Sequence, residues 1–487
     1  MKRFIGSLLI LTLMIGMVTV ASAATLIPGT LTRNITIHKS GDNPIIPGES
    51  PTTGLPSDSS YYLPVLSQID NNLEAIPQWG ISFADIMYEL PIQGQGWTRL
   101  TALFSDQYPE EAGPVRSGRV MHADLREEWD AALVHYGKQE AAGSNMKEIL
   151  SKYGVTAKGL AIDGIGNKYS SYFNRVRYHA APHNVSAYIS NIKDMLVPLN
   201  YSFPQRPFKF TDDTNYGGVP ALQFSVIHKK NKDTSSTFSY DQAMKGYQRF
   251  IRTGAYYDYL NPAEVLAYSN VIIQRTKLTF NNNTMNPLLS DVVGKGAADI
   301  FIAGQYIAGA WSRESLSDRT IFYDQNGNEL ALQRGKSWII ICDVDTEVVI
   351  GDIDTSMQNN LYSDVSENED GERLAIADVS DNIDSEPLAV PNANQAESQS
   401  EQKSADSTEQ PVESALDSKL ESNFATITVP NKGLLNMRVK NSGKSDIITR
   451  IPNGFSVEVI EREDEWTKVK YDGKIGYVMT NYLMFSK

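Results

Sequence analysis

The segment GPVRSGR at residues 113–119 combines residue types that bind anions. Its Gly-Pro pair predicts a turn, and Ser117 is a suitable N-cap for a helix that follows this turn. The free N–H groups at a helix start attract anions, and the side chains of Arg116 and Arg119 reach the same space. A guanidinium group grips a carboxylate or a phosphate with two parallel hydrogen bonds. We therefore expect Arg116, Ser117 and Arg119 to bind an anionic ligand.

A structural role for the two arginines is the alternative. Either guanidinium group would then form an internal clamp with a carboxylate, for which the candidates are Asp85, Glu89 and Asp124. Breaking such a buried pair is strongly destabilising, so a clamp and a ligand contact predict different mutant behaviour. Long-range pairing cannot be read from sequence, and both alternatives stay open.

Catalytic chemistry is a further alternative. Ser117, His135 and Asp163 supply the residue types of a nucleophile, a base and an orienting carboxylate, while His135, His183 and Asp163 could instead hold a metal. Neither set has diagnostic spacing, because the chain has no Gly-x-Ser-x-Gly elbow and no His-Glu-x-x-His helix. We therefore expect no catalytic residue, no metal and no cofactor. His135 and His183 are retained as ligand-binding candidates together with Asn184, although His183 and Asn184 also suit hydrogen bonding to backbone groups near a turn.

Two strands are predicted before this segment. FADIMYEL alternates between two faces, and TRLTALFSD returns after a glycine-containing turn, which is typical of a β-hairpin. Such a hairpin could set Glu89 near Arg99, either as a cross-strand ion pair or as part of the ligand site. Both residues are therefore included among the ligand-binding candidates.

The rest of the body mixes helix and strand patterns. Met121, Leu125 and Trp129 recur at four-residue intervals and predict one buried helical stripe, and AALVHYG predicts a strand that ends near His135. VLAYSNVIIQ, ADIFIAGQYIAGAW and RGKSWIIICDVD predict further strands in the second half. Strand-dominated stretches with a few helices indicate an α+β fold. Cys342 lies in the last of these strands, and we expect it to be a core residue.

The N-terminus predicts export. Residues 1–23 have a basic start, a long apolar run and a final Ala-Ser-Ala, which is typical of a signal peptide cleaved after Ala23. Retention as a membrane anchor is the alternative, because the apolar run is nearly long enough to span a bilayer. Cys342 is the only cysteine of the 487 residues, so the chain has no lipid attachment site near residue 23 and forms no intrachain disulfide.

The charge is concentrated in one segment. The net charge of the chain is −14, and residues 363–421 carry 16 Asp or Glu against 3 Lys or Arg, a net of −13. The remaining parts are close to neutral, which argues against binding to nucleic acid. Residues 353–423 are rich in Ser, Glu, Asp and Gln, so we expect a disordered, extended tether.

The C-terminal segment, residues 424–487, shows short strand patterns separated by turns. LLNMRVKNSG, IPNGFSVEVIE, EWTKVKYDGKIGYV and NYL follow one another in the order of the bacterial SH3 domain, which this segment closely resembles. The resemblance implies binding to cell-wall peptide or another envelope ligand, with Arg438, Trp466 and Tyr477 as surface candidates. Trp466 would alternatively be a core residue.

The body also resembles a known family. FADIMYELPIQGQGWTRLTALF, GPVRSGR, AALVHYG, AAPHNVS, SNVIIQ, GQYIAGAW and LALQRGKSWI together are similar to the YerB-like envelope proteins of Gram-positive bacteria. The resemblance implies an α+β layered β-β-α sandwich and no established reaction. The chain departs from the family pattern in three places. It lacks the lipoprotein cysteine. Ile76 stands where an arginine is usual, which puts one basic contact of a shared pocket in doubt, and GKQEAA replaces Gly-Gly-Ser after His135, which weakens inference about the loop beside this histidine.

These observations predict six segments: a signal peptide (1–23), an irregular lead-in (24–60), two YerB-like halves (61–200 and 201–352), the tether (353–423) and an SH3 barrel (424–487). We expect a secreted, wall-associated binding or scaffold protein that is not inserted in the membrane after signal cleavage. Its expected partners are peptidoglycan or envelope proteins. The alternative is a hydrolase of peptidoglycan or of a wall polymer.

Overall fold

A computed structural model describes residues 24–351 and 424–485, apart from short gaps at 40, 58–61, 95, 229–233, 263, 281–286, 291, 429–433, 443–444, 453–455, 463–464 and 472–473. The chain divides into two compact units, 1–370 and 371–487, which are described separately below as the body and the module. The predicted signal peptide and tether lie outside the described residues. The structure therefore does not test the predicted signal peptide or the predicted tether.

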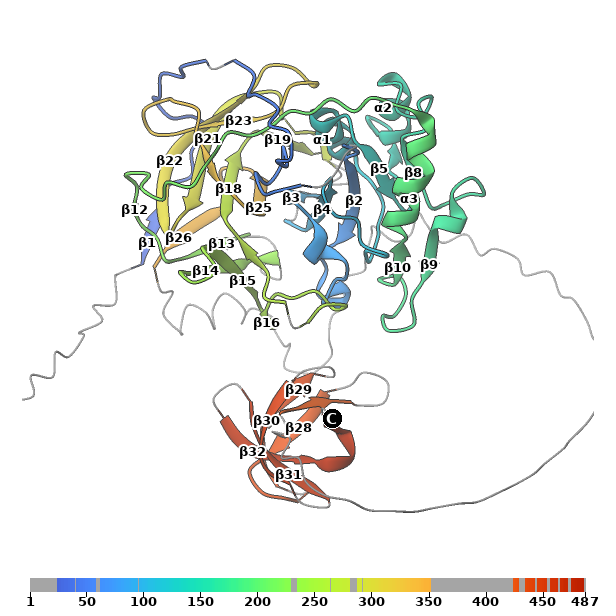
Figure 1. Ribbon diagram of the computed structural model, residues 1–487, viewed down its shortest axis with the longest axis vertical. Coiled ribbons are helices and arrows are strands. Elements are labelled where there is room, and N and C mark those ends of the chain that lie inside the picture. Colours follow the sequence, from blue (N-terminus) through green and yellow to red (C-terminus); the bar gives the residue numbers. More distant parts are fainter. Residues whose placement is uncertain are drawn as a thin grey trace, which may run out of the picture. The chain divides into compact units, whose positions relative to one another are not determined.

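A large mixed sheet runs through the body (Figure 1). Its order is β12 (Val219–Pro220), β22 (Gln305–Arg313), β21 (Gly294–Ile302), β18 (Asn270–Arg275), β25 (Ser337–Cys342), β3 (Ile86–Pro91), β4 (Thr98–Phe104), β2 (Val65–Asp70), β5 (Ala132–His135) and β8 (Ala161–Asp163), with β23 (Ile321–Tyr323) beside β22. The two predicted halves meet where β25 pairs in parallel with β3. Both halves therefore build one sheet and share one hydrophobic core.

A second sheet packs against the first. Its order is β1 (Thr25–Ile27), β26 (Glu347–Ile350), β13 (Gln223–Ile227), β14 (Ser236–Asp241), β15 (Gly246–Ile251) and β16 (Gly254–Ala255), with β17 (Ala267–Tyr268) beside β15. The ring of Phe224 on β13 stacks on that of Phe301 on β21, with ring centroids 3.5 Å apart. Aromatic contacts of this kind bury large apolar areas, so they hold the two sheets face to face.

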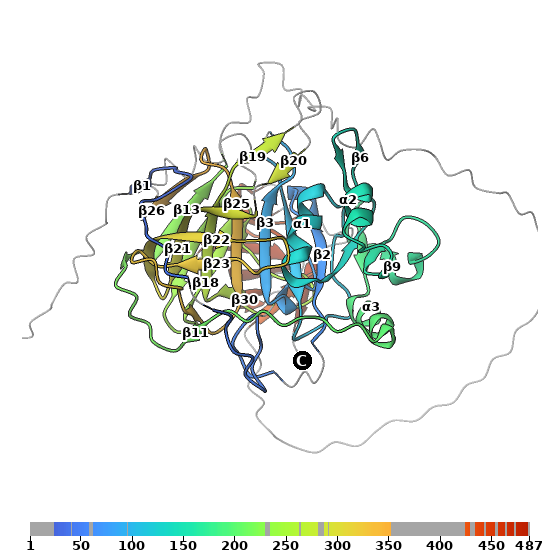
Figure 2. The same cartoon turned by 90° about the horizontal axis from the view of Figure 1, so that it is seen from above.

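Helices are few in the described part of the chain. The three α-helices are α1 (Val120–Trp129), α2 (Met146–Lys152) and α3 (Ile189–Leu196), and they gather near the β5–β8 end of the large sheet (Figures 1 and 2). The body is therefore mostly β-sheet, and the α+β layering expected from the sequence is not confirmed. None of the described helices has the length and apolar character needed to span a membrane.

Short elements complete the body. They are the paired strands β6 (Glu140–Ala141) and β7 (Ser144–Asn145), β9 (Phe173–Arg175) and β10 (Val185–Ala187), β11 (Phe210–Thr211) and β24 (Leu332–Gln333), and β19 (Leu278–Phe280) and β20 (Pro287–Ser290). Single 3₁₀ turns lie at Leu73–Ala75, Ile81–Phe83, Ser170–Tyr172 and Val197–Leu199. The pair β9–β10 carries the segment that reaches the candidate site below.

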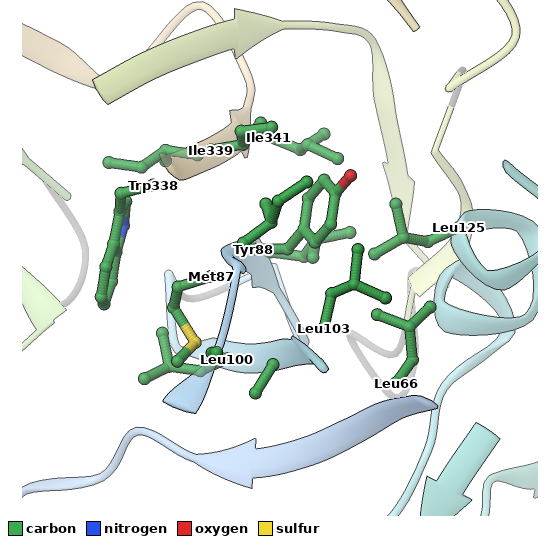
Figure 3. Close-up of a cluster of buried hydrophobic side chains, with 14 of the residues drawn as sticks. Leu66, Met87, Tyr88, Leu100, Leu103, Leu125, Trp338, Ile339 and Ile341 are labelled. Carbon is green, nitrogen blue, oxygen red and sulfur yellow. The ribbon is translucent and has the colours of Figure 1, made fainter. Parts of the chain in front are cut away.

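The predicted helical stripe is confirmed in the core. Met121, Leu125 and Trp129 are all fully buried on α1, and Figure 3 shows Leu125 beside Leu66 and Leu103 of the large sheet. Cys342 is also fully buried, and burial raises the pKa of its thiol to about 12. A thiol in this environment stays protonated, which agrees with the predicted structural role.

The lead-in lies against the body rather than apart from it. The guanidinium group of Arg33 pairs with Asp299, which is fully buried and also pairs with Arg275 at 2.7 Å. Arg33 donates to the carbonyl of Gly309 as well. Although its backbone is mostly irregular, this segment therefore supplies a charged side chain to the interior of the large sheet.

A second carboxylate anchors the lead-in. Thr52 and the backbone N–H and hydroxyl groups of Ser105 donate to one carboxylate oxygen of Asp85. Asp85 is therefore a hydrogen-bond centre that fastens the lead-in to β4, and it does not pair with Arg116 or Arg119 as the clamp alternative proposed.

Asp85 predicts a loss of stability as the pH rises from acid to neutral. Burial, followed by the negative charge of Asp106, raises the pKa of Asp85 from 3.8 to about 7. Because the folded-state pKa lies above the unfolded one, the stabilising contribution is complete below pH 3.8 and is lost as pH rises through about 7. Between about pH 6 and pH 8, the free energy of unfolding should fall by about 1.4 kcal/mol. Urea titrations at both pH values test this, and Asp85→Asn should remove most of the difference.

The module is a seven-stranded barrel-like sheet with its own core. Its strands are β27 (Phe424–Ile427), β28 (Leu434–Arg438), β29 (Ile447–Pro452), β30 (Ser456–Arg462), β31 (Trp466–Tyr471), β32 (Lys474–Met479) and β33 (Leu483–Phe485), with a 3₁₀ turn at Thr480–Tyr482. The hairpin predicted across residues 472–473 is confirmed, because β31 and β32 are antiparallel neighbours. The hairpin predicted across residues 453–454 is wrong, because β29 pairs with β28 while β30 pairs with β27 and β31. Both predicted turns lie outside the described residues.

Candidate functional site

Three neighbouring parallel strands end at the candidate site. The order β2–β5–β8 is parallel throughout, and the last residues of these strands are Asp70, His135 and Asp163. Ligands commonly bind beyond the carboxyl ends of parallel strands, because the following loops converge there. The strand order therefore brings chemistry-bearing residues together from distant parts of the sequence.

The predicted recognition loop crosses this edge. The backbone of Val115 donates to Val185 on β10, and the backbone of Arg116 donates to Gln68 on β2. The loop is thus held between two strands by backbone hydrogen bonds. This arrangement directs the residues around Arg116 toward the end of β2.

The predicted N-cap at Ser117 is wrong. Helix α1 begins at Val120, its N-cap is Arg119, and the backbone N–H of Arg119 donates to Nδ1 of His122 at 2.9 Å. The hydroxyl of Ser117 instead donates to the carbonyl oxygen of Tyr136 at 3.2 Å. The loop continues two residues further than expected because His122, the third residue of the helix, accepts a hydrogen bond from the backbone N–H of Arg119.

Asp70 is the centre of a buried ion cluster. Its carboxylate lies 2.7 Å from Nδ1 of His183 and 3.1 Å from Nε of Arg116, and Asp70 is 1 % exposed. Burial alone would raise its pKa, but the His183 hydrogen bond and the charges of Arg99 and Arg116 lower the pKa of Asp70 to about 2. Asp70 is therefore ionised over the whole physiological range. The clamp interpretation of Arg116 is supported, with a carboxylate that the sequence did not point to.

Arg99 joins Asp70 to the loop that precedes α1. It lies directly opposite Asp70 in the β4–β2 ladder, and its guanidinium group donates to the carbonyl of Ser117. Burial, then the charges of Arg99 and Arg119, hold the pKa of His122 well below its usual range. His122 is therefore neutral at physiological pH.

His135 is the second buried, neutral histidine. Its Nδ1 atom lies 2.8 Å from the carbonyl oxygen of Gly137, and burial lowers its pKa although Asp163, 3.6 Å away, opposes this effect. The Nε2 atoms of His122 and His135 are both buried, and neither has a hydrogen-bond partner in the described part of the protein. We call Arg99, Arg116, Arg119, His122, His135, His183 and Asp70 the arginine–histidine cluster.

The arrangement does not assemble the proposed catalytic or metal sets. Asp163 accepts hydrogen bonds from the backbone of Gly137 and from Lys138, while Ser117 binds a carbonyl oxygen rather than His135. His183 faces Asp70 and not Asp163. Within the described ranges, no group of three or more His, Cys, Asp or Glu side chains could hold a metal ion.

Glu89 and Arg99 belong to different clusters. In the β3–β4 hairpin, Glu89 lies opposite Leu100 while Arg99 lies opposite Leu90, so the two charged side chains are on opposite faces. Glu89 accepts a hydrogen bond from Thr98 at 2.8 Å and also lies near His228 and Trp338. The predicted hairpin is therefore confirmed, but the predicted proximity of Glu89 and Arg99 is wrong.

Asn184 stabilises its own turn. Its amide donates to the carbonyl of Val176 at 3.3 Å and accepts from Arg175 at 2.7 Å. This is the backbone-satisfying role that the sequence suggested for the APHNVS segment. His183, by contrast, is the residue of this segment that reaches the cluster.

Sequence reasoning missed Asp70 and His122. Asp70 ends a continuously buried strand, and a carboxylate at that position could have been a signal because it must find a partner. His122 follows Arg119 by three residues, which is the spacing of a capping box, but a histidine rarely takes that role. His122 becomes informative only once the helix start is known.

The module presents aromatic and basic residues on one face. Tyr477 on β32 lies opposite Lys468 on β31 and opposite Arg438 on β28, so the three side chains form a row. Trp466 follows the same alternation on β31 and is partly buried, as are the other three. The three predicted surface residues therefore share a face, to which Lys468 adds a second cation.

Comparisons with known proteins define the class. Residues 52–202 match the protein family of unknown function DUF3048 in its N-terminal domain, residues 225–339 match its C-terminal domain, and residues 432–484 match the bacterial SH3 domain. The chain is therefore a DUF3048 protein whose body precedes a bacterial SH3 module. It belongs to the YerB-like family.

A protein of Bacillus subtilis (strain 168) named "Putative lipoprotein YerB" is 27 % identical over 304 residues, covering 61 % of this chain and 87 % of that protein. The crystal structure of the YerB protein from Bacillus subtilis is similar with a TM-score of 0.52 and 25 % identity. That similarity covers 62 % of this chain and 99 % of the YerB chain.

Proposed function

We propose that this protein is exported and binds the cell wall through its SH3 module, while its body binds an anionic envelope ligand. The observation that supports wall binding is the row of Arg438, Tyr477 and Lys468 on a bacterial SH3 domain. An aromatic ring between two cations suits a peptide that carries carboxylates, because the ring packs on apolar parts while the cations pair with the charges. The lipoprotein name of the relative is consistent with an envelope protein.

The body contributes a separate binding function in this proposal. The cluster contains three guanidinium groups and two neutral histidines, His122 and His135. It also contains Asp70, whose carboxylate is ionised. Arg116 and His183 are 18 % and 13 % exposed, so the cluster is open to the surface on their side. Several positive charges in a partly desolvated site favour the binding of an anion. No observation favours the hydrolase alternative over binding.

Wall retention should depend on the module. Purified cell walls should sediment the mature chain, and a chain that ends at Glu421 should be retained at least about tenfold less. Tyr477→Ala should weaken retention by about 2 kcal/mol, the size expected for a central aromatic contact. Met484→Ala is the matched control, because Met484 is 60 % exposed on a different strand of the module. Equal sedimentation of the full and shortened chains would reject wall binding by the module.

A further inference from the structure

The hydrogen-bond partners of two buried histidines fix which ring nitrogen carries the proton. The N–H of Arg119 is a donor, so Nδ1 of His122 accepts, and the single proton of this neutral ring lies on Nε2. The carbonyl oxygen of Gly137 is an acceptor, so Nδ1 of His135 donates, and its Nε2 atom keeps a lone pair. The two unpartnered Nε2 atoms are therefore one donor and one acceptor.

These two atoms are unusual in a folded core. Both histidines are 0 % exposed, and buried polar atoms normally have hydrogen-bond partners, so a ligand could satisfy this unpartnered donor and this unpartnered acceptor together. The positive charges of Arg99 and Arg119 both act on His122 in the same direction. An anion would relieve this positive potential, whereas a water molecule would not.

We propose that the arginine–histidine cluster binds free phosphate and recognises the proton that phosphate carries. One phosphate oxygen accepts from Nε2–H of His122, the P–OH group donates to Nε2 of His135, and the remaining charge lies against the guanidinium groups. This proposal rests on the anion-binding function proposed above for the body. It adds the chemical class of the ligand to that function.

The fixed tautomers discriminate between anions of the same shape. Sulfate is tetrahedral and doubly charged but has no proton at neutral pH, and a phosphate monoester has lost its second proton at about pH 8, since that proton leaves with a pKa of about 6. Either anion would place an oxygen lone pair against the lone pair of His135. Leaving a buried acceptor unpaired weakens binding by about 1 to 3 kcal/mol, or about five- to 150-fold.

The test is calorimetric titration of the full mature chain with phosphate, sulfate and glycerol phosphate at about pH 8, where all three are divalent. Phosphate should bind at least about tenfold more tightly than either of the other two anions. If all three bind equally, proton recognition is wrong although the anion site stands. If none binds, the proposed anion-binding function of the body is wrong as well.

A variant tests the acceptor directly. His135→Gln places an amide near the position of Nε2, and an amide can donate, so sulfate should bind more tightly and the phosphate preference should fall to about threefold or less. His38→Gln is the matched control, because His38 is exposed in the lead-in, outside the arginine–histidine cluster, and its replacement should not alter the preference. An unchanged preference in folded His135→Gln would overturn the assignment, and the wild-type titration decides the matter if that variant does not fold.

Discussion

Replacing Asp70 with asparagine should destabilise the body by about 3 to 5 kcal/mol and at the same time tighten anion binding. The carboxylate is 1 % exposed and pairs with Arg116 and His183, and its pKa of about 2 shows how strongly these partners favour its charge. Asparagine has the same shape but leaves the cations without a counter-charge. The stability loss and the gain in affinity follow from the same removed charge.

Denaturant unfolding of the body and phosphate titration of the same sample measure the two effects. Asp194→Asn is the control, because Asp194 is 71 % exposed beside Lys193, and an exposed pair should change stability by less than about 1 kcal/mol. Loss of both stability and binding would show that Asp70 only shapes the loop. Unchanged stability would contradict the clamp interpretation of Arg116.

Local patterns in the sequence predicted the elements well. The alternation in FADIMYEL and TRLTALFSD predicted β3 and β4, and the stripe of Met121, Leu125 and Trp129 predicted the buried face of α1. These patterns report which side of an element is buried, and that is a local property. The bacterial SH3 module was recognised for a similar reason, because its strands and turns follow one another closely along the chain.

The candidate site could be predicted only in part. Arg116 was singled out, but its partner Asp70 is 46 positions away, and the pairing depends on the crossover that sets β2 beside β5. The helix start was placed at Ser117 because serine is a common N-cap, whereas the histidine of the actual first turn satisfies the backbone at Arg119. Strand order and cap choice are decided by tertiary packing, which a single sequence does not display.

The same limitation explains the error at Glu89. Glu89 was a candidate because it was expected to lie near Arg99. Whether the two side chains share a face depends on the hairpin register to within one residue, because adjacent positions on a strand face opposite sides of the sheet. The observed register places Glu89 in the core between the two sheets and Arg99 at the arginine–histidine cluster. The ligand-binding candidates therefore divide into two groups with different expected mutant behaviour.

Replacing Glu89 with alanine should destabilise the body by about 3 to 5 kcal/mol without weakening phosphate binding. Although burial alone would raise its pKa, the His228 hydrogen bond and the charge of Arg249 lower the pKa of Glu89, so the carboxylate is ionised in the core. Alanine would leave Arg249, which is 1 % exposed and packs between the rings of Tyr256 and Trp338, without this counter-charge.

Urea unfolding of Glu89→Ala, Glu89→Gln and Glu314→Ala measures this effect. Glu314 is 62 % exposed in its pair with Lys39, so its replacement should change stability by less than about 0.5 kcal/mol. Glutamine should be intermediate, because it keeps an oxygen for the hydroxyl of Thr98 but loses the charge. Phosphate affinity should be unchanged in every variant that folds, since Glu89 lies on the opposite face of the hairpin from Arg99. Loss of phosphate binding at normal stability would instead place Glu89 in the ligand site and would contradict the division between the two clusters.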